Sequence, residues 1–248
     1  RAGVGMDNID VEYARSKGID VINTPAASSR SVAELAMAHM LTLTRSLQIT
    51  NRSLQNPESF NALKKQLSSS TEVKGKNLVL IGFGRIGSEL AKMALALEMK
   101  VLVVDPFINS AEVRLTLGDQ QVDYELSIID KNEALGLADY ISLHAPFLGE
   151  AILGEQEFKL MKKSCIIINT SRGENIDEDA LLHALDKGMI ASAGLDVFQN
   201  EPNINNRLIN HPKISLSPHI AASTQEAQLR IAAELVDKII ALRNLLVN

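Results

Sequence analysis

Short apolar segments alternate with amphipathic ones along most of the chain beyond residue 76. The apolar segments are rich in Val, Ile and Leu, which is typical of strands that are covered on both faces. We predict such strands at 78–81, 101–104, 140–143, 165–168 and 214–216. The intervening segments predict helices at 85–99, 110–118, 155–162 and 177–187. Because strands that alternate with helices indicate a parallel sheet, we expect a doubly wound α/β domain.

Two longer amphipathic segments flank this region. Residues 31–47 and residues 223–246 both carry apolar side chains at helical spacing. Each segment opens with the sequence S-x-x-E, at Ser31 and at Ser223, which is the spacing of a capping box. We therefore predict that the two helices begin at these serines.

The composition is that of an ordinary globular protein, with 46% hydrophobic and 22% charged residues. The formal net charge is −5, which offers no electrostatic reason to expect nucleic acid or an anionic membrane as a partner. No apolar run approaches the roughly 18 residues that a membrane-spanning helix needs.

Cys165 is the single cysteine, which excludes an internal disulfide framework and a cysteine-rich zinc site. No pair of histidines has metal-ligand spacing, so we expect no metal, and we place His39 in the core.

A glycine-rich segment lies between the first predicted strand and the helix that follows it. Gly82, Gly84 and Gly87 have the spacing G-x-G-x-x-G, and Asp105 ends the next predicted strand. In a Rossmann domain such glycines allow a tight turn, approach of the backbone to a pyrophosphate, and close packing of helix on strand. The acidic residue is placed to accept hydrogen bonds from the adenosine ribose. The pattern therefore predicts a site for NAD.

Three groups suited to oxidising a 2-hydroxy acid follow predicted strands near the C-terminal end. Arg172, Glu201 and His219 lie in the segments NTSRG, GLDVF-QNEP and SPH. A histidine can take the hydroxyl proton, a carboxylate can orient it, and an arginine can hold a substrate carboxylate. Spacing alone does not show that the three side chains meet.

The chain resembles the D-isomer-specific 2-hydroxyacid dehydrogenase family from residue 1 to about residue 235. The matching motifs are RAGVGMDNID, NTP with SVAEL, LIGFGRIG, SLHAP, INTSRGENIDEDAL, GLDVF with EP, and PHIAAST. Within this family, residues 219–228 and 71–76 resemble the D-3-phosphoglycerate dehydrogenase subfamily.

The resemblance implies a role for each matching residue. His219 corresponds to the general acid and base, Glu201 to its carboxylate partner, and Arg172 to the arginine that holds the substrate. Contacts with NAD are implied for Gly82, Gly84, Arg85, Ile86, Gly87, Asp105, His144, Pro146, Thr170, Ser171 and Asp196. Substrate contacts are implied for Arg1, Val4, Gly5 and Arg172.

The family's architecture implies three parts in this chain. Residues 1–25 correspond to the end of a substrate domain and a crossover, residues 26–220 to the NAD-binding Rossmann domain, and residues 221–248 to a helix that returns to the substrate domain. In the family an earlier part of the substrate domain precedes the segment RAGVG. We therefore expect that the parent protein is longer at its N-terminal end.

The implied activity is NAD-dependent oxidation of a small D-2-hydroxy acid, with 3-phosphoglycerate as the expected substrate and 3-phosphohydroxypyruvate as the product. Two alternatives stay open: a reductase of glyoxylate, hydroxypyruvate or another 2-oxo acid, and an NAD-sensing binding protein like the co-repressors of this fold. The resemblance also implies a cytoplasmic homodimer. The apolar stripe of residues 31–47 fits a dimer contact or packing within one chain.

Overall fold

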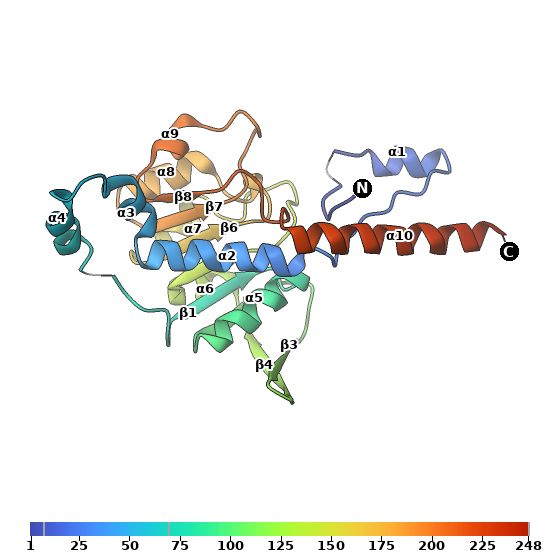
Figure 1. Ribbon diagram of the computed structural model, residues 1–248, viewed down its shortest axis with the longest axis horizontal. Helices are drawn as coiled ribbons and strands as arrows, with labels where there is room; N and C mark the ends of the chain where they lie inside the picture. The colour runs from blue at the N-terminus through green and yellow to red at the C-terminus, as the bar shows by residue number, and fades with distance from the viewer. Residues whose placement is uncertain (7, 69, 248) are drawn as a thin grey trace.

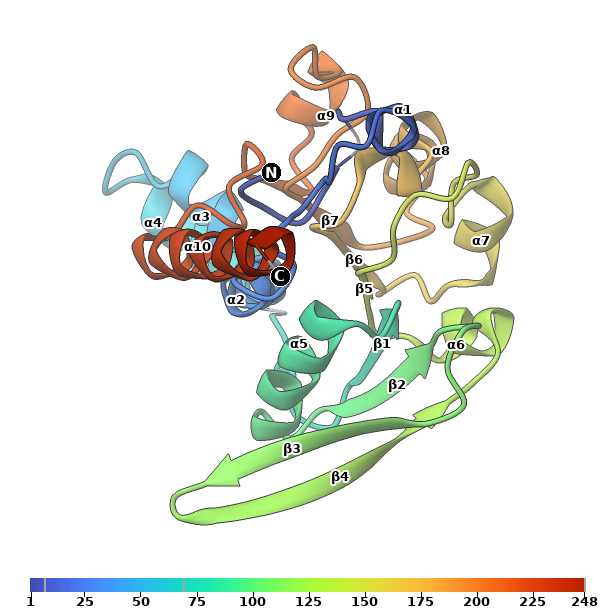
Figure 2. The ribbon, with the colours of Figure 1, turned by 90° about the vertical axis from the view of Figure 1, so that its right-hand side faces the viewer.

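The computed structural model describes residues 1–6, 8–68 and 70–247. Asp7 and Asn248 lie outside the described residues, so the predicted parts 1–25 and 221–248 are described without them. In the described residues, eight strands form one sheet in the order β3-β4-β2-β1-β5-β6-β7-β8 (Figure 2). The strands are β1 Asn77–Ile81, β2 Lys100–Val104, β3 Ala111–Leu117, β4 Gln120–Ile128, β5 Tyr140–Leu143, β6 Ile166–Asn169, β7 Ser192–Leu195 and β8 Ile214–Leu216.

The sheet is parallel from β4 to β8, and only β3 runs antiparallel to its neighbour β4. β1 pairs with β2 on one side and with β5 on the other. The chain therefore winds outward from β1 in both directions, which places a crevice at the carboxyl ends of β1 and β5. The predicted doubly wound α/β fold is confirmed.

Helices cover both faces of the sheet. The helices in the described residues are α1 Val11–Ser16, α2 Ser29–Thr44, α3 Leu47–Ser53, α4 Ser59–Gln66, α5 Arg85–Ala96, α6 Lys131–Leu137, α7 Glu155–Leu160, α8 Glu178–Asp186, α9 Asn206–Asn210 and α10 Gln225–Val247. Side chains of α2 and α5 form one core cluster with Leu78 and Leu80 of β1, and side chains of α6, α7 and α8 form another with Val79 and Ile81. Because successive side chains of a strand point to opposite faces, both faces of β1 are buried.

The helix predicted at 110–118 is wrong, because this segment forms strand β3, which pairs with β4 in an antiparallel hairpin. Ala111 and Val113 are buried while Glu112 and Arg114 are exposed, which is the alternation of a strand. Gly118, with φ +62°, occupies the turn. The hairpin projects along one edge of the molecule (Figure 2).

The predicted helix starts at Ser31 and Ser223 are also wrong. α2 begins at Ser29, and the Ser31 hydroxyl donates to the Ser28 carbonyl at 2.9 Å instead of capping the helix. In α10 the cap is Thr224, whose Oγ1 accepts from the Ala227 amide at 3.1 Å. Capping-box spacing therefore located these helices but misplaced their starts by one or two residues.

The apolar stripe of α2 packs within the chain. Val32, Ala36, Met40 and Leu43 are buried, and α2 contacts α5, β6 and β7. Of the two interpretations of this stripe, the structure supports packing within one chain. The stripe therefore gives no support to a homodimer.

The long helix α10 is joined to the crossover near the N-terminus. Glu234 Oε2 accepts from the Ala27 amide at 3.0 Å, and Lys238 Nζ donates to the Asn23 carbonyl at 2.6 Å. Beyond these contacts α10 extends away from the sheet, with the N-terminal segment beside it (Figure 1). Within the described part of the chain, no helix is both long and apolar enough to cross a membrane.

Candidate active site

Five of the predicted cofactor residues lie at one edge of the sheet, because each directly follows the carboxyl end of a parallel strand. Gly82 follows β1, Asp105 follows β2, His144 follows β5, Thr170 follows β6 and Asp196 follows β7. In open α/β sheets this edge is where ligands bind. The fold therefore gathers residues that are far apart in the sequence into one region.

Glycine suits each of these three positions for a different physical reason. Gly82 has φ +91°, and a Cβ there would lie 2.7 Å from the Ala145 amide nitrogen. A Cβ on Gly87 would lie 2.7 Å from the Gly82 carbonyl oxygen, so this glycine lets helix α5 approach the strand. Gly84 precedes α5 and has open space where a Cβ would be. That space, at the N-terminus of a helix whose first amides have no partner within the helix, fits a pyrophosphate.

Asp105 is hydrogen-bonded to the glycine-rich turn. Its Oδ2 accepts from the Phe83 amide at 2.8 Å, and its Oδ1 accepts from the Phe107 amide at 2.9 Å. The carboxylate is therefore held in place between the ends of β1 and β2, where the adenosine half of a dinucleotide lies in this fold.

His144 is neutral and lies beside the same turn. Its Nε2 is 2.9 Å from the Ser142 hydroxyl, and burial lowers the pKa of the ring to about 4. Its Nδ1 and the hydroxyl of Thr170 are buried without a hydrogen-bond partner among the described residues. Pro146, two residues further on, is exposed. Unpartnered polar atoms beside an open glycine turn fit a bound NAD.

The loop that carries Arg172 is shaped by Asn169. Asn169 Oδ1 accepts from the amide and the hydroxyl of Ser171, at 3.0 and 2.8 Å, and its Nδ2 donates to the Arg172 carbonyl at 2.8 Å. The Arg172 guanidinium donates to the Ser171 carbonyl at 2.6 Å. Asn169 is fully buried and belongs to the motif INTSRG, but no role was predicted for it. An Asn at a strand end, two residues before a Ser, is the signal that indicates such a turn.

Gly173 brings the Arg172 loop against the loop that carries Glu201. A Cβ on Gly173 would overlap the carbonyl group of Phe198 and the amide nitrogen of Gln199. The two loops therefore touch backbone to backbone, which only glycine permits.

His219 and Glu201 form a direct pair. His219 Nδ1 is 2.7 Å from Glu201 Oε2, and Glu201 Oε1 accepts from the Phe198 amide at 2.9 Å. The His219 side chain is 56% exposed, so its other ring nitrogen is open to a substrate. This pair is the arrangement expected of an oriented acid–base histidine.

Asp196 is fully buried beneath the turn that carries His219. Its Oδ1 accepts from the Ser217 hydroxyl at 2.5 Å and the Ile220 amide at 3.0 Å, and its Oδ2 accepts from the Ala221 amide at 3.0 Å. The structure thus shows Asp196 holding the turn that carries His219. Its expected contact with the nicotinamide amide stays a prediction.

The predicted substrate segment is held by the crossover. Arg1 Nε donates to the Gly5 carbonyl at 3.1 Å, and the Val4 carbonyl accepts from Asn23 Nδ2 at 2.8 Å. These bonds do not join the segment to the His219 pair, and its substrate contacts stay a prediction.

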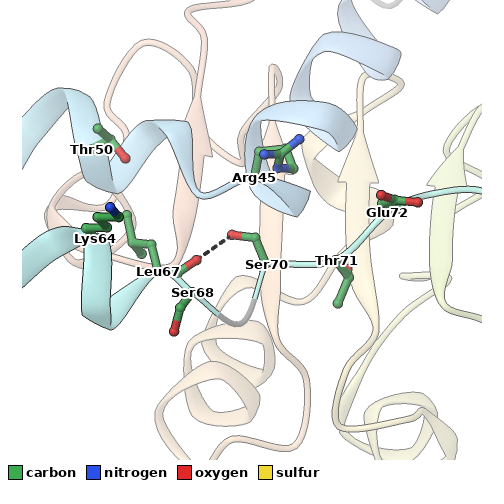
Figure 3. Close-up of a pocket in the computed structure, with 8 residues that line it drawn as sticks. All are labelled: Arg45, Thr50, Lys64, Leu67, Ser68, Ser70, Thr71 and Glu72. Carbon is green, nitrogen blue, oxygen red and sulfur yellow. Dashed lines mark hydrogen bonds between the residues drawn. The ribbon is translucent and has the colours of Figure 1, made fainter.

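The surface has two open hollows, one beside the predicted site residues at the carboxyl edge of the sheet and one away from them. One, of about 450 Å³, is bordered by neighbours of the predicted residues and is lined by Phe147, Ala151, Glu174, Asp177, Gln199 and Asn200. The other, of about 440 Å³, lies between the end of α2, helices α3 and α4, and the segment before β1 (Figure 3). That segment leads to the amino end of β1. None of the residues that line this second hollow is a predicted site residue.

Comparison with known proteins gives close relatives over nearly the whole chain. Hydroxypyruvate reductase from Thermotoga maritima is 41% identical over 244 residues, which are 96% of this chain and 75% of the relative. D-3-phosphoglycerate dehydrogenase from Methanocaldococcus jannaschii is 43% identical over 245 residues, which are 97% of this chain and 45% of the relative. The chain therefore spans less than half the length of that relative.

Solved structures share the fold. The holo form of D-mandelate dehydrogenase from Rhodotorula graminis has a TM-score of 0.85 and 28% identity, over 93% of this chain and 67% of that one. The NADPH-dependent glyoxylate/hydroxypyruvate reductase from Sinorhizobium meliloti has a TM-score of 0.82 and 28% identity, over 97% of this chain and 72% of that one. Residues 37–221 match the family described as D-isomer specific 2-hydroxyacid dehydrogenase, NAD binding domain. The chain belongs to the D-isomer specific 2-hydroxyacid dehydrogenase family and carries its NAD-binding domain.

Proposed function

We propose that this protein oxidises a D-2-hydroxy acid with NAD, and that the substrate is 3-phosphoglycerate and the product 3-phosphohydroxypyruvate. The observation that carries the proposal is the hydrogen bond of 2.7 Å between His219 Nδ1 and Glu201 Oε2. It lies at the carboxyl edge of an NAD-binding sheet, next to the loop that carries Arg172.

The cofactor site is formed by the glycine turn and its neighbours. The backbone at Gly84, Arg85 and Ile86 would hold the pyrophosphate, and Asp105 would hold the adenosine ribose. His144, Pro146, Thr170 and Ser171 would line the cleft on the nicotinamide side. When bound, NAD supplies the acceptor for the hydride that leaves the substrate carbon.

His219 takes the proton of the substrate hydroxyl. With Nδ1–H donated to Glu201, the neutral ring keeps the lone pair of Nε2 for that proton. The carboxylate of Glu201 then stabilises the imidazolium that forms. In the reverse reaction the same Nε2–H returns the proton to the carbonyl oxygen.

Arg172 holds the carboxylate of the substrate. Arg172 is half-buried, and the planar fork of donors of a guanidinium suits a carboxylate. Arg1, Val4 and Gly5 would complete the substrate site from the N-terminal segment, with the chain divided at 25/26 and 220/221 as proposed from the sequence.

The substrate assignment rests on similarity in the segment after His219 and on relatives named D-3-phosphoglycerate dehydrogenase, which are 36–43% identical. The main competing substrate is hydroxypyruvate, because the Thermotoga reductase is 41% identical and the chain covers 75% of it. A homodimer and a cytoplasmic location remain part of the proposal.

The test is a turnover screen of the purified protein. D-2-hydroxy acids are offered with NAD⁺ and 2-oxo acids with NADH, and 3-phosphoglycerate is expected to have the highest kcat/KM in the oxidative direction. A higher kcat/KM for hydroxypyruvate than for 3-phosphohydroxypyruvate would favour the second assignment. Tight NAD binding without turnover of any of these acids would contradict the enzymatic proposal and favour an NAD-sensing protein.

A further inference from the structure

His39 is a buried polar residue on α2 that lies between Ser215 of β8 and Ser217, which follows the end of that strand. Its Nδ1 is 2.9 Å from the Ser215 hydroxyl, and its Nε2 is 2.9 Å from the Ser217 hydroxyl. Gly194 of β7 makes room for it, because a Cβ there would lie 2.8 Å from the Cβ of His39. Only 5% of His39 is exposed, so the ring is part of the interior.

The hydrogen bonds determine which nitrogen of the ring carries the proton. The Ser217 hydroxyl donates its single hydrogen to Asp196 Oδ1 at 2.5 Å, so its oxygen accepts from Nε2–H of His39. Nδ1 then accepts from the Ser215 hydroxyl. Burial lowers the pKa of His39, which agrees with a neutral ring of this tautomer.

The same chain of bonds continues to the turn that carries His219. Asp196 accepts from the amides of Ile220 and Ala221, and its own carbonyl accepts from the His219 amide at 2.8 Å. His219 has φ +54°, a left-handed conformation that a non-glycine residue keeps only when its surroundings hold it there.

We propose that His39 is a positioning residue for His219. By donating to Ser217 it keeps the serine hydroxyl directed at Asp196, and Asp196 keeps the turn in the conformation that presents the His219 ring to Glu201. The inference rests on the proposed function for its kinetic consequence, but the geometry of the turn can be measured without turnover.

The kinetic test uses His39→Leu and Ser217→Ala. Each is expected to lower kcat about tenfold with the Kd for NAD changed less than twofold, and the double variant is expected to lower kcat no further, since both act on one chain of bonds. His39→Gln, which restores a donor near Nε2, should recover most of kcat. The control is Ser215→Ala, which removes only the partner of Nδ1 and should leave kcat within twofold.

A second readout follows the His219 ring by ¹⁵N NMR in the absence of substrate. The parent protein should show the tautomer protonated at Nδ1, and His39→Leu and Ser217→Ala should show mixed tautomers while Ser215→Ala does not. An unchanged tautomer with kcat unchanged in the folded fraction, or additive losses in the double variant, would overturn the proposal. If the parent turns over no acid, the proposed function fails and the NMR comparison still decides the role of His39.

Discussion

His219 and Glu201 are 18 residues apart in the sequence and are joined by a bond of 2.7 Å between Nδ1 and Oε2. The second carboxylate oxygen of Glu201 is engaged by the Phe198 amide at 2.9 Å. The carboxylate is therefore fixed at one oxygen by the backbone and directs the ring with the other. One neutral tautomer of His219, with the proton on Nδ1, satisfies this arrangement.

Glu201→Gln should reverse that tautomer. A glutamine whose oxygen accepts from the Phe198 amide presents its NH₂ group to His219, so the ring must accept at Nδ1 and carry its proton on Nε2. A wrong tautomer removes the base, and we expect kcat for oxidation to fall by about 10²–10⁴-fold. Steady-state kinetics together with ¹⁵N shifts of the ring check this. A variant with normal kcat would mean that the pair has no part in proton transfer.

His219→Ala should remove the acid–base step and leave the cofactor site intact. General acid–base catalysis contributes about 10²–10⁴-fold, and kcat should fall by that factor. The Kd for NADH, measured by fluorescence, should change less than twofold, because the glycine turn and Asp105 are untouched. His183→Ala, an exposed residue on α8, is the matched control. Retained turnover with weakened NADH binding would assign His219 to the cofactor site instead.

Asp105 should make the protein prefer NAD over NADP. A phosphate about 4 Å from the carboxylate is repelled by about 4 kcal/mol at an effective dielectric of about 20. Residues 106–109, Pro-Phe-Ile-Asn, contain no cation to offset this. Allowing for screening, we expect at least about 100-fold higher kcat/KM with NAD.

Asp105→Ala should narrow this preference. Asp105→Asn serves as the control, because it removes the charge and keeps an oxygen acceptor for the Phe83 amide. Equal use of both cofactors by the parent protein would show that the carboxylate does not face the ribose.

His144 should make stability depend on pH. Its pKa is about 4 in the folded protein and about 6.5 when unfolded, so between these values the unfolded chain binds a proton that the folded one does not. The contribution of the neutral His144 ring to the free energy of unfolding is therefore fully present above about pH 6.5. It is lost as the pH falls, by about 2 kcal/mol between pH 7 and pH 5. Urea unfolding of the parent and of His144→Gln at both values checks this. An equal loss in the two proteins would contradict the assignment.

Gly173→Ala should separate the loop that carries Arg172 from the loop that carries Glu201. The added Cβ would overlap the Phe198 carbonyl, which neither backbone can avoid without moving. We expect a loss of about 3 kcal/mol in the free energy of unfolding and a fall in kcat. Gly136→Ala in α6 is the control, because its Cβ would meet only the Leu160 carbonyl oxygen, at 3.8 Å. The higher helix propensity of alanine should raise the free energy of unfolding of this variant by up to about 1 kcal/mol. Equal stability of the two variants would contradict the close contact.

The sequence by itself determined five strands of the parallel part of the sheet, β1, β2, β5, β6 and β8, and the glycine turn, whereas β4 and β7 were not predicted. The core strands are continuous apolar segments because both of their faces are buried, and that property is visible without knowledge of their partners. The glycine spacing was visible as well: Gly82 has a positive φ, and Gly82 and Gly87 both lie where a Cβ would meet the backbone, so glycine is the residue that fits there. Family resemblance then supplied the candidate roles of Arg172, Glu201 and His219.

Tertiary structure decided the features that depend on distant partners. The segment 111–117 forms a strand because Ala111 and Val113 are buried against the sheet. Helical propensity is a local property and does not predict such a contact. His39 was expected in the core, but its partners Ser215 and Ser217 lie 176 and 178 residues away, beyond any local pattern. Short-range periodicity therefore predicts which faces are buried. Which buried polar atoms meet is settled only when the sheet brings the ends of its strands together.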